Sequence, residues 1–411
     1  MKVLFINQFY YPDVAATAQL LTDVAEDLAA AGAEVTVVTG RRSYSDGRSL
    51  GPAQETHHGV RIRRVQGPAL RRNAVWDRYV SYAAFWMAAA ARCAMLPRQD
   101  VVVPLTTPPL LSCLGVLLKR LRGSRLLCWS MDVYPELGIL LGALRGGSAT
   151  ARLVGGLMAW SLQRADLVIA LGEHMAKRLT LKGVRQDRIR VLPTWENSAR
   201  IAPTARSANP FRAAHGLDGR FVVLYSGNLG AAHDFGTLLD AAETLAERPD
   251  ILFLIAGGGP RLPWVQAEVE RRRLANVRFV PYQPRHALRY SLPAGDVHLV
   301  TLRPDFEGLL VPSKFVGALA SGRPLLYVGP RSGEVPDAVR AGACGVVVEP
   351  GDAAGLASAI VALQRDDARR DAMGARARQL FEQNYTREKV AAEFCQMLHE
   401  VTYNAGKAGG R

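Results

Sequence analysis

A serine and a lysine at the start of a short apolar helix are the first candidates for chemistry in this sequence. They lie in the segment Glu307–Pro324, EGLLVPSKFVGALASGRP, where Ser313 and Lys314 follow a proline and the apolar run stops at Gly322. A helix start gathers unpaired backbone N–H groups and a partial positive charge, and Lys314 adds an ammonium group. This combination favours an anion, most naturally a phosphate. From this segment alone, a capped helix with a solvated lysine is an equally good interpretation.

Two glycine-rich loops follow apolar strands in the second half of the sequence. The strand Phe221–Tyr225 leads into SGNLG, residues 226–230, and the strand Ile251–Ala256 leads into GGGPR, residues 257–261. Small residues and exposed amides beside a helix start suit a diphosphate. Neither loop matches the GxGxxG dinucleotide pattern or a Walker loop, which weakens a nicotinamide or ATPase function. Each loop alone also fits a tight turn, but several at one sheet edge indicate a ligand site.

A carboxylate and two adjacent tyrosines follow strands in the first half of the sequence. Asp132 comes shortly after the strand Leu126–Trp129, and Tyr10 and Tyr11 lie in the loop NQFYYPD after the first strand. A carboxylate in this position can orient an acceptor hydroxyl, and a turn or N-cap aspartate is an equally good interpretation. The tyrosines fit a sugar or a lipid-linked acceptor, or equally the packing of a domain interface. His233 is a lone histidine, which is more often structural than catalytic.

The elements that position these residues alternate as strand, loop and helix along most of the chain. Val3–Ile6 is an apolar strand, residues 18–31 carry apolar side chains at helical spacing, and Glu34–Thr39 is the next strand. This completes a βαβ unit. The alternation restarts at Phe221 after a stretch without periodicity. We therefore predict an α/β protein with two doubly wound, Rossmann-like domains that face a central cleft, and ligands beyond the carboxyl ends of the strands.

The boundaries between the expected parts come from changes in composition. Residues 1–197 form the first domain, and residues 198–219, rich in Ala, Ser, Asn, Pro and Arg, form a linker. Residues 220–384 form the second domain. Residues 385–411 form a last helix and a flexible, glycine-rich tail. A length of 411 residues agrees with two domains of ordinary size.

The composition is that of a globular protein with a strongly basic balance. Hydrophobic residues make up 49% and charged residues 21%, which excludes a disordered chain. The formal net charge of +14 favours a phosphorylated substrate or anionic lipid head groups as partners. Nucleic acid is disfavoured because the arginines are spread along the chain without a nucleic-acid-binding motif. An Ala/Arg-rich composition that uses arginine in place of lysine explains the charge as well.

We expect a cytoplasmic protein, in peripheral contact with the inner face of the cytoplasmic membrane. The apolar run at the N-terminus is too short for a signal peptide, and the apolar stretches elsewhere are too short or are interrupted by prolines. A basic and aromatic segment with Arg71, Arg72 and the pair Phe85-Trp86 fits contact with a membrane or with an acceptor. The aromatic pair fits a core better, and the arginines fit a solvated surface as well. Reduced, buried thiols are expected for the five widely spaced cysteines, Cys93, Cys113, Cys128, Cys344 and Cys395.

The sequence resembles bacterial glycosyltransferases of family 4, which have the GT-B fold. It is most similar to the subgroup that acts in O-antigen, capsule and exopolysaccharide assembly. The resemblance runs almost end to end and is carried by the segments NQFYYPD, EVTVVTG, LTTPP, MDVYPE, VLPTWEN, LYSGNLG, AGGGPR and VPSKFVGALASGRP. Each segment is moderately specific, and their order and spacing are difficult to obtain by chance.

The resemblance implies a metal-independent sugar transfer from a nucleotide sugar, with retention of anomeric configuration. The second domain would bind the donor, the first domain the acceptor, and the last helix would cross back to the first domain. The implied catalytic residues are Asp132, which faces the reacting sugar, and Glu307. The implied donor-binding residues are Gly227, Asn228, Gly230, Gly258, Pro281, Tyr282, Ser313 and Lys314, with the base near Pro281 and Tyr282. The implied acceptor-binding residues are Tyr10, Tyr11 and Thr17.

The sequence departs from the family pattern at the acidic residues and in the diphosphate loop. The family commonly has two glutamates eight positions apart, and here those positions are Leu309 and Gly317. A ribose contact through a carboxylate at Gly317 is therefore lost, and Glu307 replaces the first glutamate if the loop shifts by two residues. The Arg and Lys that are frequent in the diphosphate loop are Asn228 and His233. Phosphate binding then depends on Lys314 and backbone amides.

We therefore expect a transferase that moves a hexosyl or N-acetylhexosaminyl group from a nucleotide sugar to a lipid-linked or glycan acceptor, in cell-surface polysaccharide or glycoconjugate biosynthesis. No cofactor or metal is expected, because the sequence has no HxH or HExxH pattern and no carboxylate cluster. A sugar-nucleotide 2-epimerase on the same fold is the alternative enzyme, but no convincing acid and base pair can be placed for it. The missing glutamates also allow a nucleotide-sugar-binding protein without catalysis.

Overall fold

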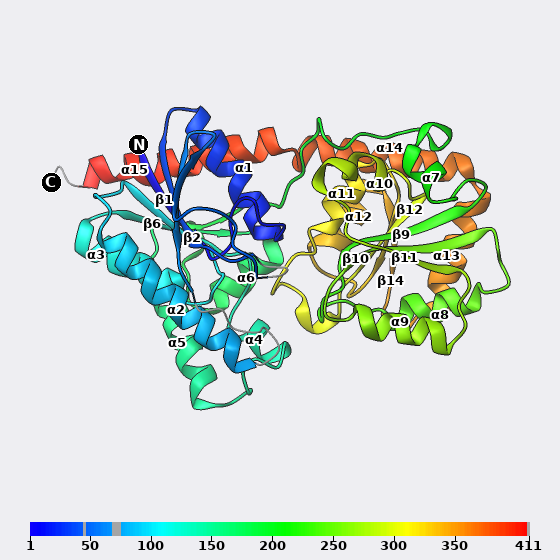
Figure 1. Ribbon diagram of the computed structural model, residues 1–411, viewed down its shortest axis with the longest axis horizontal. Coiled ribbons are helices and arrows are strands. Elements are labelled where there is room, and N and C mark those ends of the chain that lie inside the picture. The colour runs from blue at the N-terminus through cyan, green and yellow to red at the C-terminus, as the bar shows by residue number, and fades with distance from the viewer. Residues whose placement is uncertain (44–46, 68–74, 409–411) are drawn as a thin grey trace. The chain divides into compact units, whose positions relative to one another are not determined.

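The computed structural model describes residues 1–43, 47–67 and 75–408, and the chain forms two compact units (Figure 1). The first unit comprises residues 1–193, residues 308–310 and the chain from Glu388 onward. The second comprises residues 194–307 and 311–387. The expected tail at residues 409–411 and the expected membrane contact through Arg71 and Arg72 lie outside the described residues. Each unit contains its own sheet.

The first unit is built on an eight-stranded sheet with the order β3-β4-β2-β1-β5-β6-β7-β8. The strands are β1 (Lys2–Ile6), β2 (Glu34–Gly40), β3 (Gln54–His57), β4 (Val60–Val65), β5 (Val101–Pro104), β6 (Arg125–Trp129), β7 (Leu167–Ala170) and β8 (Ile189–Val191). The helices are α1 (Ala16–Ala30), α2 (Val75–Ala94), α3 (Leu111–Arg122), α4 (Glu136–Leu140), α5 (Ala149–Leu162), α6 (Glu173–Leu181) and α15 (Arg387–Ala408), with the 3-10 turn η1 (Gln186–Arg188). All pairings are parallel except that of β3 with β4, which is antiparallel.

Helices on both faces of the first sheet explain its nearly continuous apolar strands. Successive side chains of a strand point to opposite faces. Leu4 and Ile6 of β1 belong to a core cluster with Phe85 of α2 and with side chains of α3. On the opposite face Phe5 lies 6.0 Å, ring centre to ring centre, from Phe394 of α15. A strand buried on both sides carries apolar residues at every position, which is why the sequence signals these strands so clearly.

The second unit is built on a six-stranded sheet with the order β11-β10-β9-β12-β13-β14. Its strands are β9 (Phe221–Asn228), β10 (Ile251–Gly258), β11 (Val277–Val280), β12 (Val297–Thr301), β13 (Leu325–Val328) and β14 (Gly345–Val348), all paired in parallel. Its helices are α7 (Pro210–Ala214), α8 (Gly236–Thr244), α9 (Leu262–Arg271), α10 (Leu288–Ser291), α11 (Lys314–Ala320), α12 (Glu334–Gly342), α13 (Ala353–Arg365) and α14 (Asp367–Asn384). Three 3-10 turns complete the unit: η2 (Arg206–Ala208), η3 (Arg285–Ala287) and η4 (Pro304–Phe306).

The two faces of the second sheet bury separate core clusters. Val223 and Tyr225 of β9 pack in a cluster with Leu239 of α8 and with side chains of α13. Val222 and Leu224, which alternate with them along β9, pack in a second cluster on the opposite face, with Phe211 of α7. The fold of each unit is therefore the doubly wound α/β arrangement that the alternation of elements predicts.

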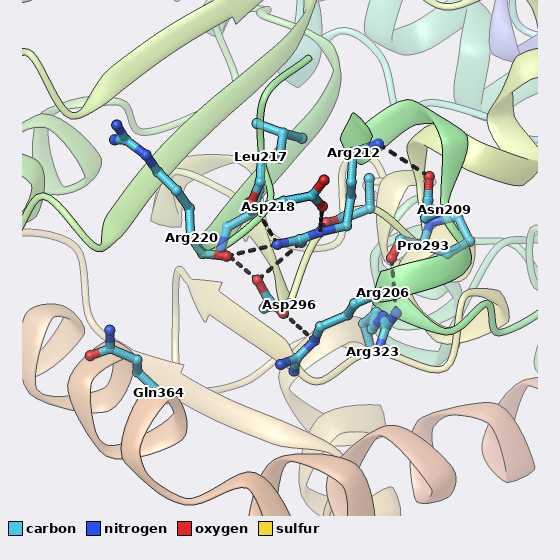
Figure 2. A network of polar contacts seen from close by, with 12 residues as sticks. Arg206, Asn209, Arg212, Leu217, Asp218, Arg220, Pro293, Asp296, Arg323 and Gln364 are labelled. Carbon is cyan, nitrogen blue, oxygen red and sulfur yellow. Dashed lines mark hydrogen bonds and ion pairs between the residues drawn. The ribbon is translucent and has the colours of Figure 1, made fainter. Parts of the chain in front are cut away.

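The stretch expected to be a linker, residues 198–219, contains η2 and α7 and packs on the second unit (Figure 2). Arg212 is 3% exposed and donates hydrogen bonds to the carbonyl oxygens of Leu217, Arg220 and Ala294. Asp296 is 1% exposed and forms ion pairs with Arg206, at 2.5 Å, and with Arg212, at 3.3 Å. These buried polar contacts order the stretch, although its composition resembles that of a linker.

Two features of the first unit differ from the regular pattern of parallel strands. The edge strand β3, with the sequence QETH, was not predicted, because its polar residues lack the alternation of a half-buried strand. The last helix packs with the first unit from Glu388 onward, and Phe394 lies 5.0 Å from the ring centre of Trp129. Within the described residues, none of the helices combines the length and the apolar character that crossing a bilayer requires.

Candidate active site

The candidate donor site lies where the strand order of the second sheet changes direction. β9 is flanked by β10 on one side and by β12 on the other, so the chain crosses over at β9 and β12. Ligands of doubly wound sheets bind at such a position, beyond the carboxyl ends of the strands. The last residues of β9 and β10 pair as Gly227 with Gly257 and Asn228 with Gly258. Backbone amides of both strands therefore end at this point.

The backbone angle of this turn favours glycine, and Lys314 passes directly over it. Gly227 has a φ of +132°, and a Cβ atom placed on it would lie 2.8 Å from Cε of Lys314. A side chain at Gly259, whose φ is +136°, would collide with the side-chain oxygen of Asn228. Gly230 lies next to the same asparagine, since a Cβ atom placed on this glycine would be 3.1 Å from Nδ2. The two loops and the lysine thus form one compact surface.

The amine of Lys314 is half-buried and is held by a histidine. Its Nζ atom lies 2.8 Å from Nε2 of His233 and 5.4 Å from the centre of the Tyr225 ring. The hydroxyl of Tyr225 donates to the backbone carbonyl of Asn228, at 2.8 Å. Burial lowers the pKa of Lys314 from 10.5 to about 7. The amine therefore loses its proton far more readily than an exposed lysine.

His233 is buried between the lysine and the sheet. Its Nδ1 atom lies 2.6 Å from the carbonyl oxygen of Thr301, the last residue of β12. Burial, together with the nearby charge of Lys314, lowers the pKa of His233 to about 3. The imidazole is therefore neutral at physiological pH. From the sequence alone, a functional role for this histidine had little weight. The signal in the sequence was its position, because the family frequently has a lysine there.

An exposed aromatic ring borders the same surface. Tyr282 is 56% exposed and follows β11, and its ring carbon Cε2 would lie 3.1 Å from a Cβ placed on Gly258. Pro281, the preceding residue, is also exposed. The tyrosine ring therefore lies against the backbone of the β10 loop while more than half of the residue stays exposed. A planar base can stack on such a ring.

Contrary to the prediction from the sequence, Ser313 does not cap α11. It occupies the N-cap position with φ −57° and ψ −19°, and its side chain makes no capping hydrogen bond. An N-cap serine normally has non-helical angles, which let its oxygen reach the following N–H groups, and these angles are already helical. The hydroxyl is exposed instead. Of these two neighbouring residues, it is Lys314 that lies against the glycine turn.

The acidic residue expected to act in the second unit lies next to another helix. Glu307 follows η4, and its Oε1 atom accepts a hydrogen bond from the hydroxyl of Ser332, at 2.9 Å, just before α12. Leu309, at the position of the family's first glutamate, is buried, and its carbonyl oxygen accepts from the N–H of Val133, at 2.9 Å. Gly317, at the second position, lies within α11, and a Cβ there would be 3.3 Å from Leu292.

In the first unit, Asp132 lies beyond the carboxyl end of β6 and is half-buried. Desolvation raises its pKa from 3.8 to about 6, and the nearby Thr106 hydroxyl counters part of this effect. Thr106 belongs to the loop after β5, which also contacts the loop after β1, because the N–H of Gln8 donates to the carbonyl of Thr107, at 2.8 Å. The carboxylate therefore lies by the ends of β5 and β6, and the loop after β5 connects this place to the loop after β1.

The candidate acceptor residues have different degrees of accessibility. Tyr10 is fully buried, and its hydroxyl has no hydrogen-bond partner among the residues that the structure describes. Tyr11 is half-buried and stacks on His57, with ring centres 3.8 Å apart. Thr17 is half-buried in the first turn of α1. Tyr11 and Thr17 are therefore reachable for a ligand, whereas Tyr10 packs in the core.

Within the second unit, the structure gathers most of the expected donor-binding residues. Gly227, Asn228, Gly230, Gly258, Tyr282 and Lys314 lie around the ends of β9, β10 and β11. Glu307 accepts its hydrogen bond from Ser332, beside α12. Two further residues were not expected to form this surface, namely Tyr225 and Thr301, and His233, which the sequence places in the diphosphate loop, had been given low weight. A half-buried cation beside backbone amides can bind a diphosphate and stabilise negative charge on it.

Two family models match successive parts of the chain. Residues 16–195 match a glycosyl transferase 4-like domain, and residues 208–380 match the glycosyl transferases of group 1. Among known proteins, the chain is 26% identical to WcaI of Escherichia coli K12, assigned by its name to colanic acid biosynthesis, over 78% of this chain and 82% of that protein. It is 27% identical to WbjE of Pseudomonas aeruginosa, named as a glycosyltransferase, over 74% of this chain and 76% of that protein.

Solved structures share the fold of the whole chain. The sucrose-phosphate synthase of Thermosynechococcus elongatus is similar with a TM-score of 0.79 and 21% identity, over 98% of this chain and 100% of that one. HepE of Anabaena, in complex with UDP-glucose, has a TM-score of 0.74 and 17% identity, over 97% of this chain and 100% of that one. Together with the two family models, these similarities show that the protein is a glycosyltransferase of family 4 with the GT-B fold.

Proposed function

We propose that this glycosyltransferase moves a hexosyl or N-acetylhexosaminyl group from a nucleotide sugar to a lipid-linked or glycan acceptor, with retention, in cell-surface polysaccharide biosynthesis. The observation that carries the proposal is the passage of Lys314 over the glycine turn at the end of β9. A diphosphate fits this surface because it needs a cation and close backbone amides. The assignment of WcaI to colanic acid biosynthesis supports the polysaccharide, and the UDP-glucose complex of HepE supports the nucleotide sugar.

In the proposed reaction, the bond between the anomeric carbon and the diphosphate oxygen breaks. The acceptor oxygen forms a bond to the same carbon on the same face, and the acceptor proton is taken up by the released diphosphate. Negative charge grows on the diphosphate as the bond breaks, and protonated Lys314 and the backbone amides near Gly227 stabilise it. Asp132 faces the reacting sugar, and Glu307 contacts the donor sugar. The reaction as proposed uses no metal and no cofactor, since Lys314 supplies the cation.

In the proposed reaction, the donor binds to the second unit and the acceptor to the first unit. The base of the donor stacks near Pro281 and Tyr282, whose ring is accessible. The acceptor binds to the first unit near Tyr11 and Thr17, at the strand ends that also hold Asp132. The family commonly has a glutamate where this sequence has Gly317, so the ribose lacks a carboxylate partner at that position. Binding of the donor therefore relies on its base and diphosphate.

A transfer assay with matched variants tests the proposal. The protein is incubated with UDP-, GDP- and dTDP-sugars and a bacterial lipid extract, and released nucleotide and sugar-lipid product are measured. Lys314→Ala is expected to lower turnover about 100-fold, as does the loss of one donor to a developing anion. Lys177→Ala, which removes an exposed lysine of α6, is the control and keeps full turnover. Full turnover of Lys314→Ala would contradict the role of this lysine.

The same assay separates the alternative functions. A transferred sugar with released nucleotide supports the transferase. A donor whose sugar is isomerised, without nucleotide release, identifies a sugar-nucleotide 2-epimerase. Binding without either product identifies a nucleotide-sugar-binding protein. A thermal-shift screen of the same donors shows which base and sugar bind, because a ligand that binds only the folded state raises the melting temperature.

We further place the enzyme in the cytoplasm, on the inner face of an anionic membrane. Exposed apolar side chains on α2 and α3, Met87 at 64% and Leu121 at 70%, accompany the basic last turn of α3. These two helices contribute to one core cluster of the first unit. Apolar and cationic side chains together favour anionic lipid surfaces. A pelleting assay with phosphatidylglycerol vesicles, and phosphatidylcholine vesicles for comparison, tests this placement.

The double variant Met87→Glu/Leu121→Glu is expected to abolish pelleting with phosphatidylglycerol vesicles, since it adds negative charge to the contact. Leu181→Glu changes another exposed leucine, on α6, and should leave pelleting intact. Equal pelleting of the double variant and the unmodified protein would contradict a membrane contact through α2 and α3.

A further inference from the structure

The imidazole of His233 has a defined tautomer. Its Nδ1 atom lies 2.6 Å from the carbonyl oxygen of Thr301, which can only accept a hydrogen bond, so Nδ1 must carry the hydrogen. In a neutral imidazole, Nε2 then carries the lone pair. Nζ of Lys314, 2.8 Å from Nε2, must therefore be the donor in that contact. A sheet carbonyl thus sets the direction of both hydrogen bonds.

The other neighbours of the Lys314 amine carry no negative charge. From β9, Tyr225 presents its ring 5.4 Å from Nζ, and its hydroxyl donates to the carbonyl of Asn228. Burial raises the pKa of this tyrosine well above 10, so the phenol stays neutral. From the loop before α8 comes His233, and from β12 only the carbonyl of Thr301, through the imidazole. Among the described residues, no carboxylate affects the pKa of Lys314, which burial alone lowers.

This arrangement leaves the lysine positioned but without a counter-charge. An acidic partner would hold the amine in the same place, but it would compete with an anionic ligand for it. A neutral acceptor keeps the direction of the amine without that competition. The stem of Lys314 lies against Gly227, so the amine stays beside the turn that ends β9. A diphosphate arriving at this turn brings the missing negative charge.

We propose that His233 is a positioning residue that orients the Lys314 amine without supplying a counter-charge, and that binding of the donor diphosphate brings a proton onto this amine. The proposal rests on the proposed donor site. The proton comes from solvent and adds to the lone pair of Nζ, and no other bond changes. The imidazole stays neutral and keeps accepting a hydrogen bond from the ammonium group. Above pH 7, the donor is thus recognised by a charge that forms mainly when the donor binds.

Isothermal titration calorimetry in buffers of different ionisation enthalpy measures this proton. The probe is whichever of UDP-glucose, GDP-mannose and dTDP-rhamnose raises the melting temperature most, since the diphosphates of these sugars do not titrate near neutrality. With an amine pKa of about 7, the enzyme should take up ~0.9 proton per donor bound at pH 8, and about 0.1 at pH 6. Uptake that is zero, or equal at both pH values, would overturn the proposal.

Variants at position 233 separate positioning from a merely structural role. His233→Glu supplies a permanent counter-charge, so it should abolish proton uptake at pH 8 and weaken donor binding. His233→Ala should weaken donor binding about tenfold, the effect of one lost hydrogen bond, and His233→Gln should restore part of it because an amide offers both a donor and an acceptor. A loss of binding without any change in proton uptake in His233→Glu would identify a structural residue instead.

His298→Gln serves as the matched control. His298 is also buried in the second unit, with Nε2 2.9 Å from the carbonyl oxygen of Leu292, but it has no contact with Lys314. This variant should keep the proton uptake of the unmodified enzyme, and a change as large as that in His233→Glu would contradict a specific role for His233. If none of the three nucleotide sugars binds, the proposed donor site itself is wrong. Binding without the predicted proton overturns only the present inference.

Discussion

Nζ of Lys314 lies 2.8 Å from Nε2 of His233, and the opposite nitrogen of that imidazole lies 2.6 Å from the carbonyl oxygen of Thr301. The two hydrogen bonds that join these three residues connect the end of the central strand β12 to the start of α11. This arrangement brings the amine to the edge of the second sheet without a carboxylate beside it. The protonated form of this amine is disfavoured in the empty site and is stabilised by an anionic ligand.

The first prediction concerns stability against pH. The pKa of Lys314 falls from 10.5 in the unfolded chain to about 7 in the folded protein. Between these values the unfolded chain binds more protons, so stability should rise as the pH increases from 7 to 10. Lys314→Met should flatten this rise, and Lys177→Met, at an exposed lysine, should not. Urea-unfolding midpoints at pH 7, 8 and 9 measure the slope, and equal slopes in all three proteins would refute the prediction.

The second prediction uses the contact between Gly227 and Lys314. Gly227→Ala places a methyl group 2.8 Å from Cε of the lysine, so the amine must move away from the turn. We expect kcat/KM to fall at least about 30-fold, because the amine no longer reaches the diphosphate. Gly219→Ala also lies at a positive φ, of +74° compared with +132° at Gly227, but it has no atom within 4 Å of the new methyl group. It should cost about 1 kcal/mol of stability and leave kcat/KM unchanged.

The third prediction tests the aromatic ring beside Gly258. Tyr282→Ala removes an exposed surface for stacking, so KM for the donor should rise about tenfold with little change in melting temperature. Tyr282→Phe retains the ring and should retain KM. Trp264→Ala, at another partly exposed aromatic residue of the second unit, is the control. If the alanine and phenylalanine variants behave alike, the ring is not the base-binding surface.

The fourth prediction separates stability from activity at Asp132. Its folded-state pKa of about 6 lies above the unfolded value of 3.8, so the folded protein binds more protons between these values and loses stability as the pH rises through them. Asp132→Asn should therefore be more stable than the unmodified protein at pH 8, and this advantage should disappear near pH 4. Thermal melts across this range measure it. Asp371→Asn, at an exposed aspartate of α14, should show no such trend.

The same variant should lose activity, by about 100-fold, if the ionised carboxylate faces the reacting sugar. In the unmodified enzyme, kcat/KM should then decline as the pH falls below about 6. A profile that stays level down to pH 5 would exclude a requirement for the ionised form.

The fifth prediction concerns the buried ion pairs in Figure 2. Asp296→Ala leaves the buried Arg212 with only the exposed Asp218 carboxylate, 3.9 Å away, and the N–H of Val222 without its side-chain acceptor, which lies at 2.6 Å. Unpairing a buried charge should destabilise the protein by about 3 to 5 kcal/mol. Asp250→Ala removes one member of the more exposed pair with Arg248 and should cost less than about 1 kcal/mol. Urea unfolding measures both, and similar losses in the two variants would refute a special role for the buried network.

Much of the site could be predicted from the sequence because it follows strands that are easy to recognise. β9 and β10 are buried on both faces, so their apolar runs stand out, and the glycines that end them are required by close backbone contacts. The edge strand β3 and the packing of residues 198–219 were not predicted, because QETH has no apolar pattern and Arg212 finds its partner Asp296 only in the folded chain.

The sequence by itself determined the alternation of strands and helices, the glycine turns, the presence of Lys314 and the similarity to family 4. It could do so because each of these depends on residues that are close together along the chain. The tertiary structure decided that Ser313 makes no cap, that Tyr10 is buried and that His233 holds Lys314. His233 and Lys314 are 81 residues apart in the sequence. Their hydrogen bond and their shared low-dielectric environment therefore form only when the neighbouring strands pair.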